Sequence, residues 1–210
     1  MNTMQNIDCE MMKVAIRIPD WDLSNEILYK MCREYPNHES DKEIIAKILI
    51  IGLVYSAAIE RRKRVENNSD MFYIKDVAPT IRKSKIDEWL HTLTGLECPT
   101  RENCVQIIYV HKKVTDLLKK ISGLEKRSLA SKYLLFHFPK LFFIYDARSS
   151  SALSQIEPRP VVWSPVFAKY DYMYTRFFLR CMNFVDRIDS QCKVYLTPRQ
   201  LDKYLLSREN

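Results

Sequence analysis

The chain has 210 residues, of which 47% are hydrophobic and 28% charged, a composition that suits one well-packed domain and is not typical of a disordered protein. It contains 3 glycines, too few for a fold rich in tight β-hairpins or glycine-lined phosphate loops. A formal net charge of +7 makes nucleic acid the leading class of partner, although excess lysine also serves solubility.

The cysteines lie at positions 9, 32, 98, 104, 181 and 192 and include no CxxC pair. The first residues also lack the charged and then apolar segment of a secretory signal, so we expect reduced thiols and a cytoplasmic protein. Cys98 and Cys104 together with His91 and His111 match no common zinc spacing. We therefore expect neither a metal nor another cofactor.

Segments with helical hydrophobic spacing alternate with prolines and polar turns, which predicts a mainly α-helical, bundle-like protein. Pro36 and Pro139 end two of the predicted helices, and Thr197 caps the last one. No repeat or composition shift marks a boundary, so we expect a single helical domain over residues 1–210, with two lobes, 1–100 and 101–210, as the alternative. In chain order the predicted helices cover residues 23–35, 44–59, 84–90, 101–121, 128–138, 169–188 and 198 onward.

The longest apolar stretch, residues 44–59, contains Lys47 and is shorter than the roughly 20 residues that a membrane span requires. We interpret it as a buried central helix with Ser40 or Asp41 as its N-cap. No membrane partner is expected.

Three polar residues near the end of this predicted helix are candidates for substrate binding. Tyr55, Glu60 and Arg61 stand where their side chains can project into a pocket. The alternative is a helix end that is simply solvated, an interpretation that suits the arginines and lysine at 62–64 better than Tyr55 and Glu60.

Residues 121–150 carry the pattern that is most informative about function. Gly123 breaks a cationic amphipathic helix, Lys126 and Arg127 begin the next helix, and an apolar run then ends at Asp146. This order of features resembles the hairpin-to-aspartate segment of the helix-hairpin-helix DNA glycosylases, especially the 8-oxoguanine DNA glycosylase-like branch. The resemblance covers about 30 of the 210 residues.

The resemblance implies a helical fold with a lesion pocket beside the hairpin and a target nucleotide rotated out of duplex DNA. In that family, hairpin amides bind a DNA phosphate, a lysine attacks the sugar and an aspartate assists departure of the base. The family turn usually has two glycines. Here Glu125 follows Gly123 by two positions and brings a negative charge close to the expected phosphate.

Two lysines are candidates for the nucleophile. Lys126 lies 20 residues before Asp146, which is close to the family spacing, whereas Lys132 lies 14 residues before it within an Ala-Ser-Lys motif. An amine attacks in its neutral form, and Arg127 next to Lys126 would lower the pKa of that lysine. Spacing favours Lys126, and Lys132 is retained.

Asp146 has a defined task in base excision, because a carboxylate stabilises the positive charge that develops on the sugar. The alternative role is an N-cap for a helix that starts near Arg148, and both roles can coexist. His137 would bond a phosphate or act as a base, or else be a partly buried histidine bonded to a carbonyl. The further candidates for substrate binding are Gly123, Arg127, Ser131, His137, Arg148, Tyr55, Glu60 and Arg61.

These features predict a DNA N-glycosylase, either with or without an additional abasic-site lyase activity, that acts on a damaged base or on a hypermodified phage base in antiviral defence. The competing hypothesis is a non-catalytic helical module that binds nucleic acid or a partner protein, with a salt-dependent affinity and no chemistry. A metal-dependent nuclease ranks last, because the sequence has no cluster of carboxylates at metal-ligand spacing.

Overall fold

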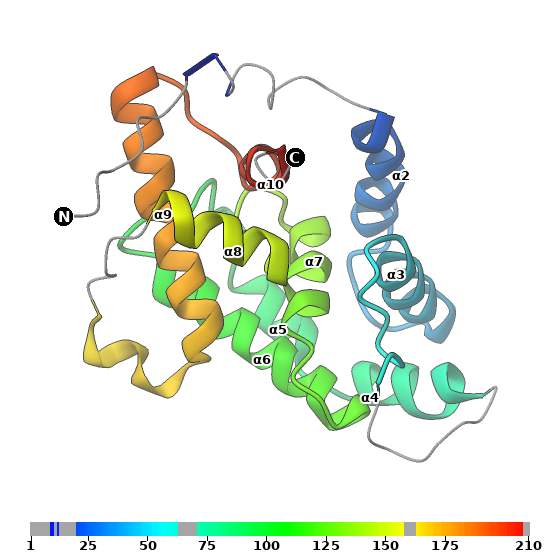
Figure 1. Ribbon diagram of the computed structural model, residues 1–210. Coiled ribbons are helices and arrows are strands. Elements are labelled where there is room, and N and C mark those ends of the chain that lie inside the picture. The colour runs from blue at the N-terminus through cyan, green and yellow to red at the C-terminus, as the bar shows by residue number, and fades with distance from the viewer. Residues whose placement is uncertain (1–8, 11, 13–19, 63–70, 158–162, 208–210) are drawn as a thin grey trace.

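A computed structural model describes residues 9–10, 12, 20–62, 71–157 and 163–207, which fold into helices without any strand (Figure 1). This confirms the predicted mainly α-helical class. The main helices are α2 (Asp20–Glu34), α3 (Asp41–Val54), α4 (Ala78–Arg82), α5 (Ile86–His91), α6 (Cys104–Ser122), α7 (Arg127–His137), α8 (Ala147–Ile156), α9 (Tyr172–Cys192) and α10 (Pro198–Ser207). A π-helical turn (Tyr73–Val77) precedes α4, and a 3-10 turn (Pro165–Lys169) precedes α9.

Helix α7 occupies the centre of the molecule (Figure 1). It packs against α2 and α3 on one side and α6 on the other, while α8 packs against α9 and α10. The residues of α7 from 129 to 136 are all buried, and they include the polar Ser131 and Lys132. Because both of its ends reach the surface, α7 can present polar groups at two separate places.

Helix α6 follows the expected amphipathic pattern, with apolar residues such as Ile107, Val114 and Leu118 in the core. It ends at Gly123, whose φ of 73° is left-handed and whose N–H donates to the carbonyl of Lys119 at 2.8 Å. A side chain is strained in this conformation, so the glycine allows the chain to turn directly into α7.

Helix α3 stops at Val54, five residues before the end that its apolar sequence predicts. The chain turns back at Ser56, which has a φ of 51°, and lies so close to α3 that a Cβ on Gly52 would be 3.0 Å from Cα of Ala58. Ser40 occupies the N-cap position but makes no capping side-chain bond. Lys47 is fully buried, and its amine donates to the carbonyls of Tyr35 and Asn37 at 2.7 and 2.9 Å.

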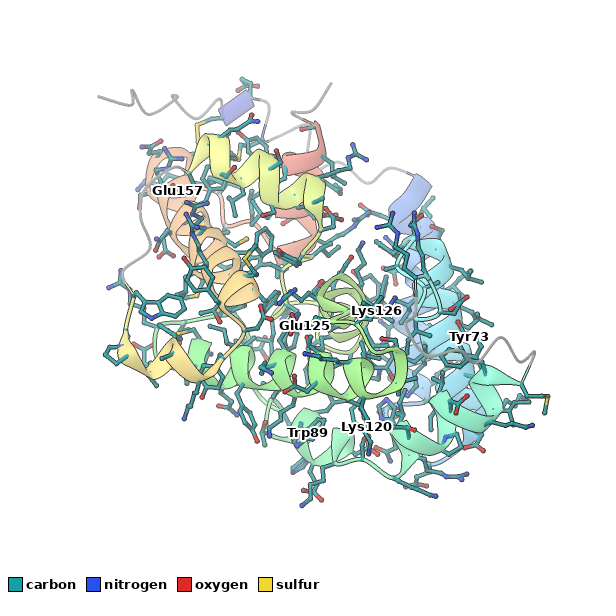
Figure 2. All side chains as sticks on the ribbon, turned by 60° about the horizontal axis from the view of Figure 1, so that its bottom comes forward. Tyr73, Trp89, Lys120, Glu125, Lys126 and Glu157 are labelled. Atoms are coloured by element: carbon teal, nitrogen blue, oxygen red, sulfur yellow. A yellow bond between two sulfur atoms is a disulfide. The ribbon has the colours of Figure 1, made fainter. Side chains whose placement is uncertain are left out.

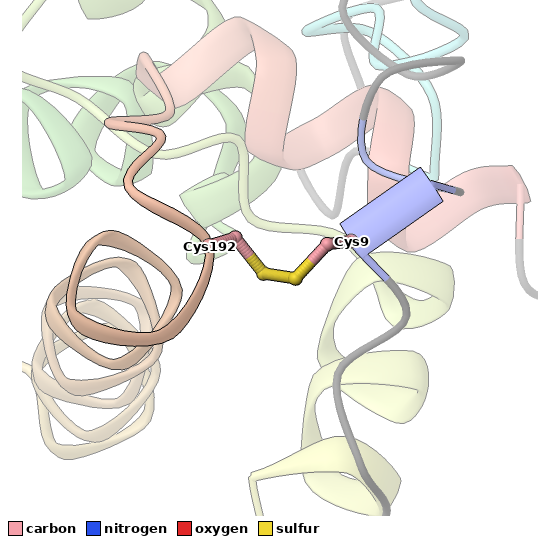
Figure 3. Close-up of a disulfide and its surroundings, with 2 residues drawn as sticks. All are labelled: Cys9 and Cys192. Carbon is pink, nitrogen blue, oxygen red and sulfur yellow. A yellow bond between two sulfur atoms is a disulfide. The ribbon is translucent and has the colours of Figure 1, made fainter.

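Cys9 and Cys192 form a disulfide that joins an early segment of the chain to the end of α9 (Figure 3). The prediction of six reduced thiols is therefore wrong for this pair, because residues 183 positions apart give no sequence signal of their proximity. The other cysteines, all within the described residues, are unpaired. Disulfides persist mainly in oxidising compartments, so this bond argues against the expected cytoplasmic location.

Over the described part of the chain, no helix has the length and apolar character to cross a bilayer.

Candidate active site

A broad open groove of about 1040 Å³ lies where three segments meet. One wall is the segment that follows α3, the floor is the turn between α6 and α7, and the other wall is the start of α8. Figure 2 shows Glu125 and Lys126 in that turn. The lining residues are Ser56, Ala57, Ala58, Arg61, Arg62, Lys119, Gly123, Leu124, Glu125, Lys126, Arg127, Ser128, Leu129, Tyr145, Asp146 and Ala147.

Positive charge dominates the groove, because its lining holds five cations and two carboxylates. Glu125 pairs with Lys119 at 3.1 Å and also with Arg127, whose Nε bonds Asp171 at 2.6 Å. The acidic residue that replaces the expected second glycine is thus neutralised by its neighbours. A negatively charged ligand in the groove would meet a net positive field.

The N-terminal end of helix α7 faces this groove, and the first three residues of the helix belong to the lining. The first N–H groups of a helix have no partner within the helix and carry a partial positive charge. Lys126 stands at the N-cap position and provides no side-chain cap, while its carbonyl accepts from Ala130 at 2.9 Å. An anion in the groove can therefore receive hydrogen bonds from this helix end.

The amine of Lys126 reaches across the groove and donates to the carbonyl of Arg61 at 2.5 Å. Partial burial lowers the pKa of this lysine, and the neighbouring Arg61 and Arg62 lower it further, although Glu60 opposes them. The cations that act on Lys126 thus come from the segment after α3. Arg127, which the sequence suggested for this task, is engaged by Glu125 and Asp171 instead.

Lys132 lies beneath the groove, with its side chain 6% exposed. Its amine donates to Ser128 Oγ at 3.0 Å and to the carbonyl of Tyr55 at 3.3 Å, and it stands 3.4 Å from a carboxylate oxygen of Asp146. The Tyr55 ring also faces the amine, 5.6 Å from ring centre to Nζ. These contacts hold Lys132 in one position against Asp146.

Asp146 is the N-cap of α8, because one of its carboxylate oxygens accepts from the Ser149 N–H at 2.9 Å. Its other oxygen faces Lys132, and the side chain, 28% exposed, lines the groove. The capping role that the sequence allowed is therefore present, together with an oriented carboxylate at the groove wall. Helix α8 starts at Ala147, one residue before the predicted position.

Behind Asp146 lies a buried carboxyl group that the sequence did not reveal. Asp202 on α10 accepts from Ser149 Oγ at 3.0 Å and from Arg199 at 2.7 Å. Burial raises the pKa of Asp202 to about 6, with Arg199 opposing the shift and Asp146 adding to it. Nothing in the local sequence of α10 distinguishes this aspartate from an exposed one.

Several of the remaining predicted residues lie outside the groove lining and support the segments that form it. Tyr55, whose hydroxyl donates to Asn25 at 2.9 Å, and Glu60, which accepts from Tyr73, support the segment beside the groove. Ser131 is buried, and its hydroxyl accepts from the Tyr145 N–H at 3.0 Å. The residues outside the groove lining are Tyr55, Glu60, Ser131, Lys132, His137 and Arg148.

His137 lies at the opposite end of α7 and faces a different cavity of about 630 Å³. Its ring stacks on His38 with 5.5 Å between the centres, and its Nε2 is buried without a hydrogen-bond partner in the described part of the structure. Burial lowers the pKa of His137, and the nearby Lys47 lowers it further. The structure therefore separates His137 from Asp146. Arg148, by contrast, is exposed in the first turn of α8.

Two cations of the groove were missed by sequence reasoning. Arg62 belongs to a charged string that we interpreted as solvated, and Lys119 belongs to the cationic face of α6. A signal existed for Lys119, because it lies one helical turn before Gly123 and must therefore be near the hairpin turn. Arg62 had no such signal, since its position depends on the early end of α3.

Comparisons with family models, curated proteins and solved structures gave no match for this chain. Within the described ranges, no three side chains of histidine, cysteine, aspartate or glutamate gather closely enough to hold a metal ion.

Proposed function

We propose that this protein is a DNA glycosylase with abasic-site lyase activity, in which Lys126 is the nucleophile and Asp146 stabilises the charge on the sugar. The observation that carries the proposal is that both side chains line one cationic groove at the start of α7. The groove is large enough for an extruded nucleotide, since small-molecule sites commonly have volumes of about 300–1,000 Å³.

The chemistry requires a neutral amine. Nζ of Lys126 forms a bond to C1′ of the nucleotide while the bond between C1′ and the base breaks. The bonding electrons leave with the base, which takes up a proton, and the attached nitrogen loses one. The sugar ring then opens as the C1′–O4′ bond breaks, O4′ takes up the remaining proton of the nitrogen, and an imine is left between C1′ and Lys126. The depressed pKa of this lysine favours the neutral form that the first step needs.

Asp146 acts while the bond to the base is breaking and positive charge develops on the sugar. Its carboxylate is held by the Ser149 N–H and by Lys132, so it requires little reorganisation during the reaction. In this mechanism Lys132 is a positioning residue, because its contacts with Ser128, Tyr55 and Asp146 orient the carboxylate. Lys126 bonds the carbonyl of Arg61 and must leave it before it attacks.

Borohydride trapping tests the proposal. The full chain is incubated with duplexes that carry an abasic site, 8-oxoguanine, uracil or a glucosylated phage base, and the imine is reduced to a stable adduct. We expect an adduct with the wild type and its loss in Lys126→Ala. Asp146→Asn should slow base removal more than it slows adduct formation at a preformed abasic site, because the carboxylate acts before the base has left.

Lys120→Ala is the matched control, because Lys120 is an exposed lysine of α6 that lies across the helix from Lys126 (Figure 2). Retention of the adduct in Lys126→Ala together with its loss in Lys132→Ala would assign the nucleophile to Lys132. Absence of any adduct, with no alkali-labile site on any substrate, would refute the glycosylase.

A non-catalytic DNA-binding module is the second candidate, and specific contacts favour it. Asp146 already caps α8, and both lysines bond carbonyls of the segment after α3, which are structural roles. This alternative predicts that duplex DNA binds with a salt-dependent affinity and is recovered unchanged.

A further inference from the structure

A small pocket lies between α8 and α9, outside the groove. It has a volume of about 70 Å³ and is lined by Ser150, Leu153, Met173, Arg176, Phe177 and Arg180. The two arginines are four residues apart on α9, so their side chains project from the same face of the helix, one turn apart. Leu153, Met173 and Phe177 are the apolar part of the lining, and the two arginines and Ser150 are its polar part.

The two arginines differ in their pairing from the other cations of this region. No carboxylate of the described residues lies within salt-bridge distance of either one, whereas Arg127, Arg187 and Arg199 are all paired. Nε of Arg180 is buried and has no hydrogen-bond partner among the described atoms. Burial and the charge of Arg176 both lower the pKa of Arg180, and the more distant carboxylate of Glu157 opposes them. Two adjacent cations with an unsatisfied buried donor are a site for an anion.

The pocket adjoins the groove along two helices. On α8, Asp146 lies at the groove and Ser150 at the pocket, one turn further, with the Ser150 N–H donating to the carbonyl of Asp146 at 3.0 Å. On α9, Asp171 caps the helix and binds Arg127 of the groove, and Arg176 follows in the next turns. Asp146 and Ser150 are therefore about 6 Å apart along the axis of α8. Successive phosphates of one DNA strand are about 3.4 Å apart along the duplex axis, so this separation is less than two nucleotide steps.

We propose that Arg176 and Arg180, with Ser150, bind a backbone phosphate of the DNA strand as it leaves the groove. This inference rests on the proposed binding of DNA in the groove. Guanidinium groups match a phosphate through paired hydrogen bonds, and the partial burial of Arg180 strengthens such bonds. The phosphate bound there would fix the position of the strand relative to Lys126 without taking part in the chemistry.

The test compares the full-length wild type with Arg176→Gln/Arg180→Gln by fluorescence anisotropy on a duplex with a tetrahydrofuran abasic analogue, over a range of salt concentrations. The control, Lys83→Gln/Arg101→Gln, removes the same charge from two exposed residues outside the groove and the pocket. We expect the pocket variant to bind about tenfold more weakly or worse, and its salt slope to fall by about 0.9 for each phosphate that it no longer neutralises. The control variant should bind nearly as the wild type does. Thermal melting verifies that both variants are folded.

Equal affinities and salt slopes for the two double variants would overturn this inference. Adduct formation separates the inference from the proposed catalysis. If the wild type binds DNA and the pocket variant shows a lower affinity and a smaller slope, the phosphate site stands even when no substrate gives an adduct. If Lys126-dependent adducts form and the pocket variant binds like the control, the phosphate site alone is refuted. A wild type that does not bind DNA would refute both.

Discussion

The amines of Lys126 and Lys132 both donate to carbonyls of the segment after α3, but they face different surroundings. Lys126 lines the open groove among Arg61 and Arg62, and its pKa is depressed. Lys132 is nearly inaccessible, and its amine is enclosed by several groups that include the Asp146 carboxylate. Nucleophilic attack needs an amine that can reach the substrate, which is why the proposed mechanism uses Lys126 as the nucleophile and Lys132 for orientation.

At the same scale, Asp202 gives a prediction about stability and pH. The pKa of Asp202 in the folded protein is raised from its ordinary value to about 6, because burial disfavours the carboxylate. The protonated Asp202 therefore makes its full contribution to the free energy of unfolding below about pH 4, and this contribution is lost as the pH rises through about 6. Each unit by which the pKa of Asp202 is raised on folding is worth 1.36 kcal/mol, so the free energy of unfolding falls by about 3 kcal/mol.

Between pH 4 and pH 7, we expect the free energy of unfolding in urea to fall more in the wild type than in Asp202→Asn. The difference between the two falls should be about 3 kcal/mol. The variant is the matched comparison, because its amide keeps the shape of the side chain and does not titrate in this range. Parallel pH profiles for the two proteins would contradict the raised pKa.

At the scale of elements, the sequence predicted those helices whose ends are determined locally. Helices α6 and α7 begin and end within three residues of their predicted limits, because amphipathic spacing, Gly123 and Pro139 mark them. The predicted end of α3 was wrong: the chain turns back at Ser56 and Ala58 packs against Gly52, a tertiary contact that has no local sequence signal. Lys126 and Asp146 were chosen from the resemblance of residues 121–150, and both line the groove. The presence of Arg62 in the groove was not predicted, because it depends on where α3 ends.

The contact between α3 and the segment after it predicts the effect of a substitution at Gly52. In Gly52→Ala the new Cβ would lie 3.0 Å from Cα of Ala58, so the segment must move away from the helix. Such overpacking costs about 1–3 kcal/mol, and the better helix propensity of alanine returns about 1 kcal/mol. We expect lower stability in urea and weaker trapping, because the segment carries Arg61 and Arg62. Leu53→Ala, at an exposed neighbouring position, should change neither. A Gly52→Ala protein as stable as the wild type would show that the segment adapts freely.

At the scale of the whole molecule, the core connects helices from both halves of the chain. A single cluster of buried residues extends from Met12 to Leu205, and α7 at its centre contacts α2, α3 and α6. The groove therefore depends on elements from distant parts of the sequence, and its geometry is secured only when these have assembled. The Cys9–Cys192 disulfide joins two such distant parts.

This disulfide gives a prediction for the intact protein. A crosslink between residues 183 apart restricts the unfolded chain strongly, so reduction should lower the free energy of unfolding by about 3–5 kcal/mol. Unfolding in urea with and without reductant measures the difference, and Cys9→Ser/Cys192→Ser should be as unstable as the reduced wild type and insensitive to reductant. Alkylation of the denatured, unreduced protein should modify only the four unpaired cysteines. Modification of all six would mean that the pair is reduced, and the expected cytoplasmic location would then regain its support.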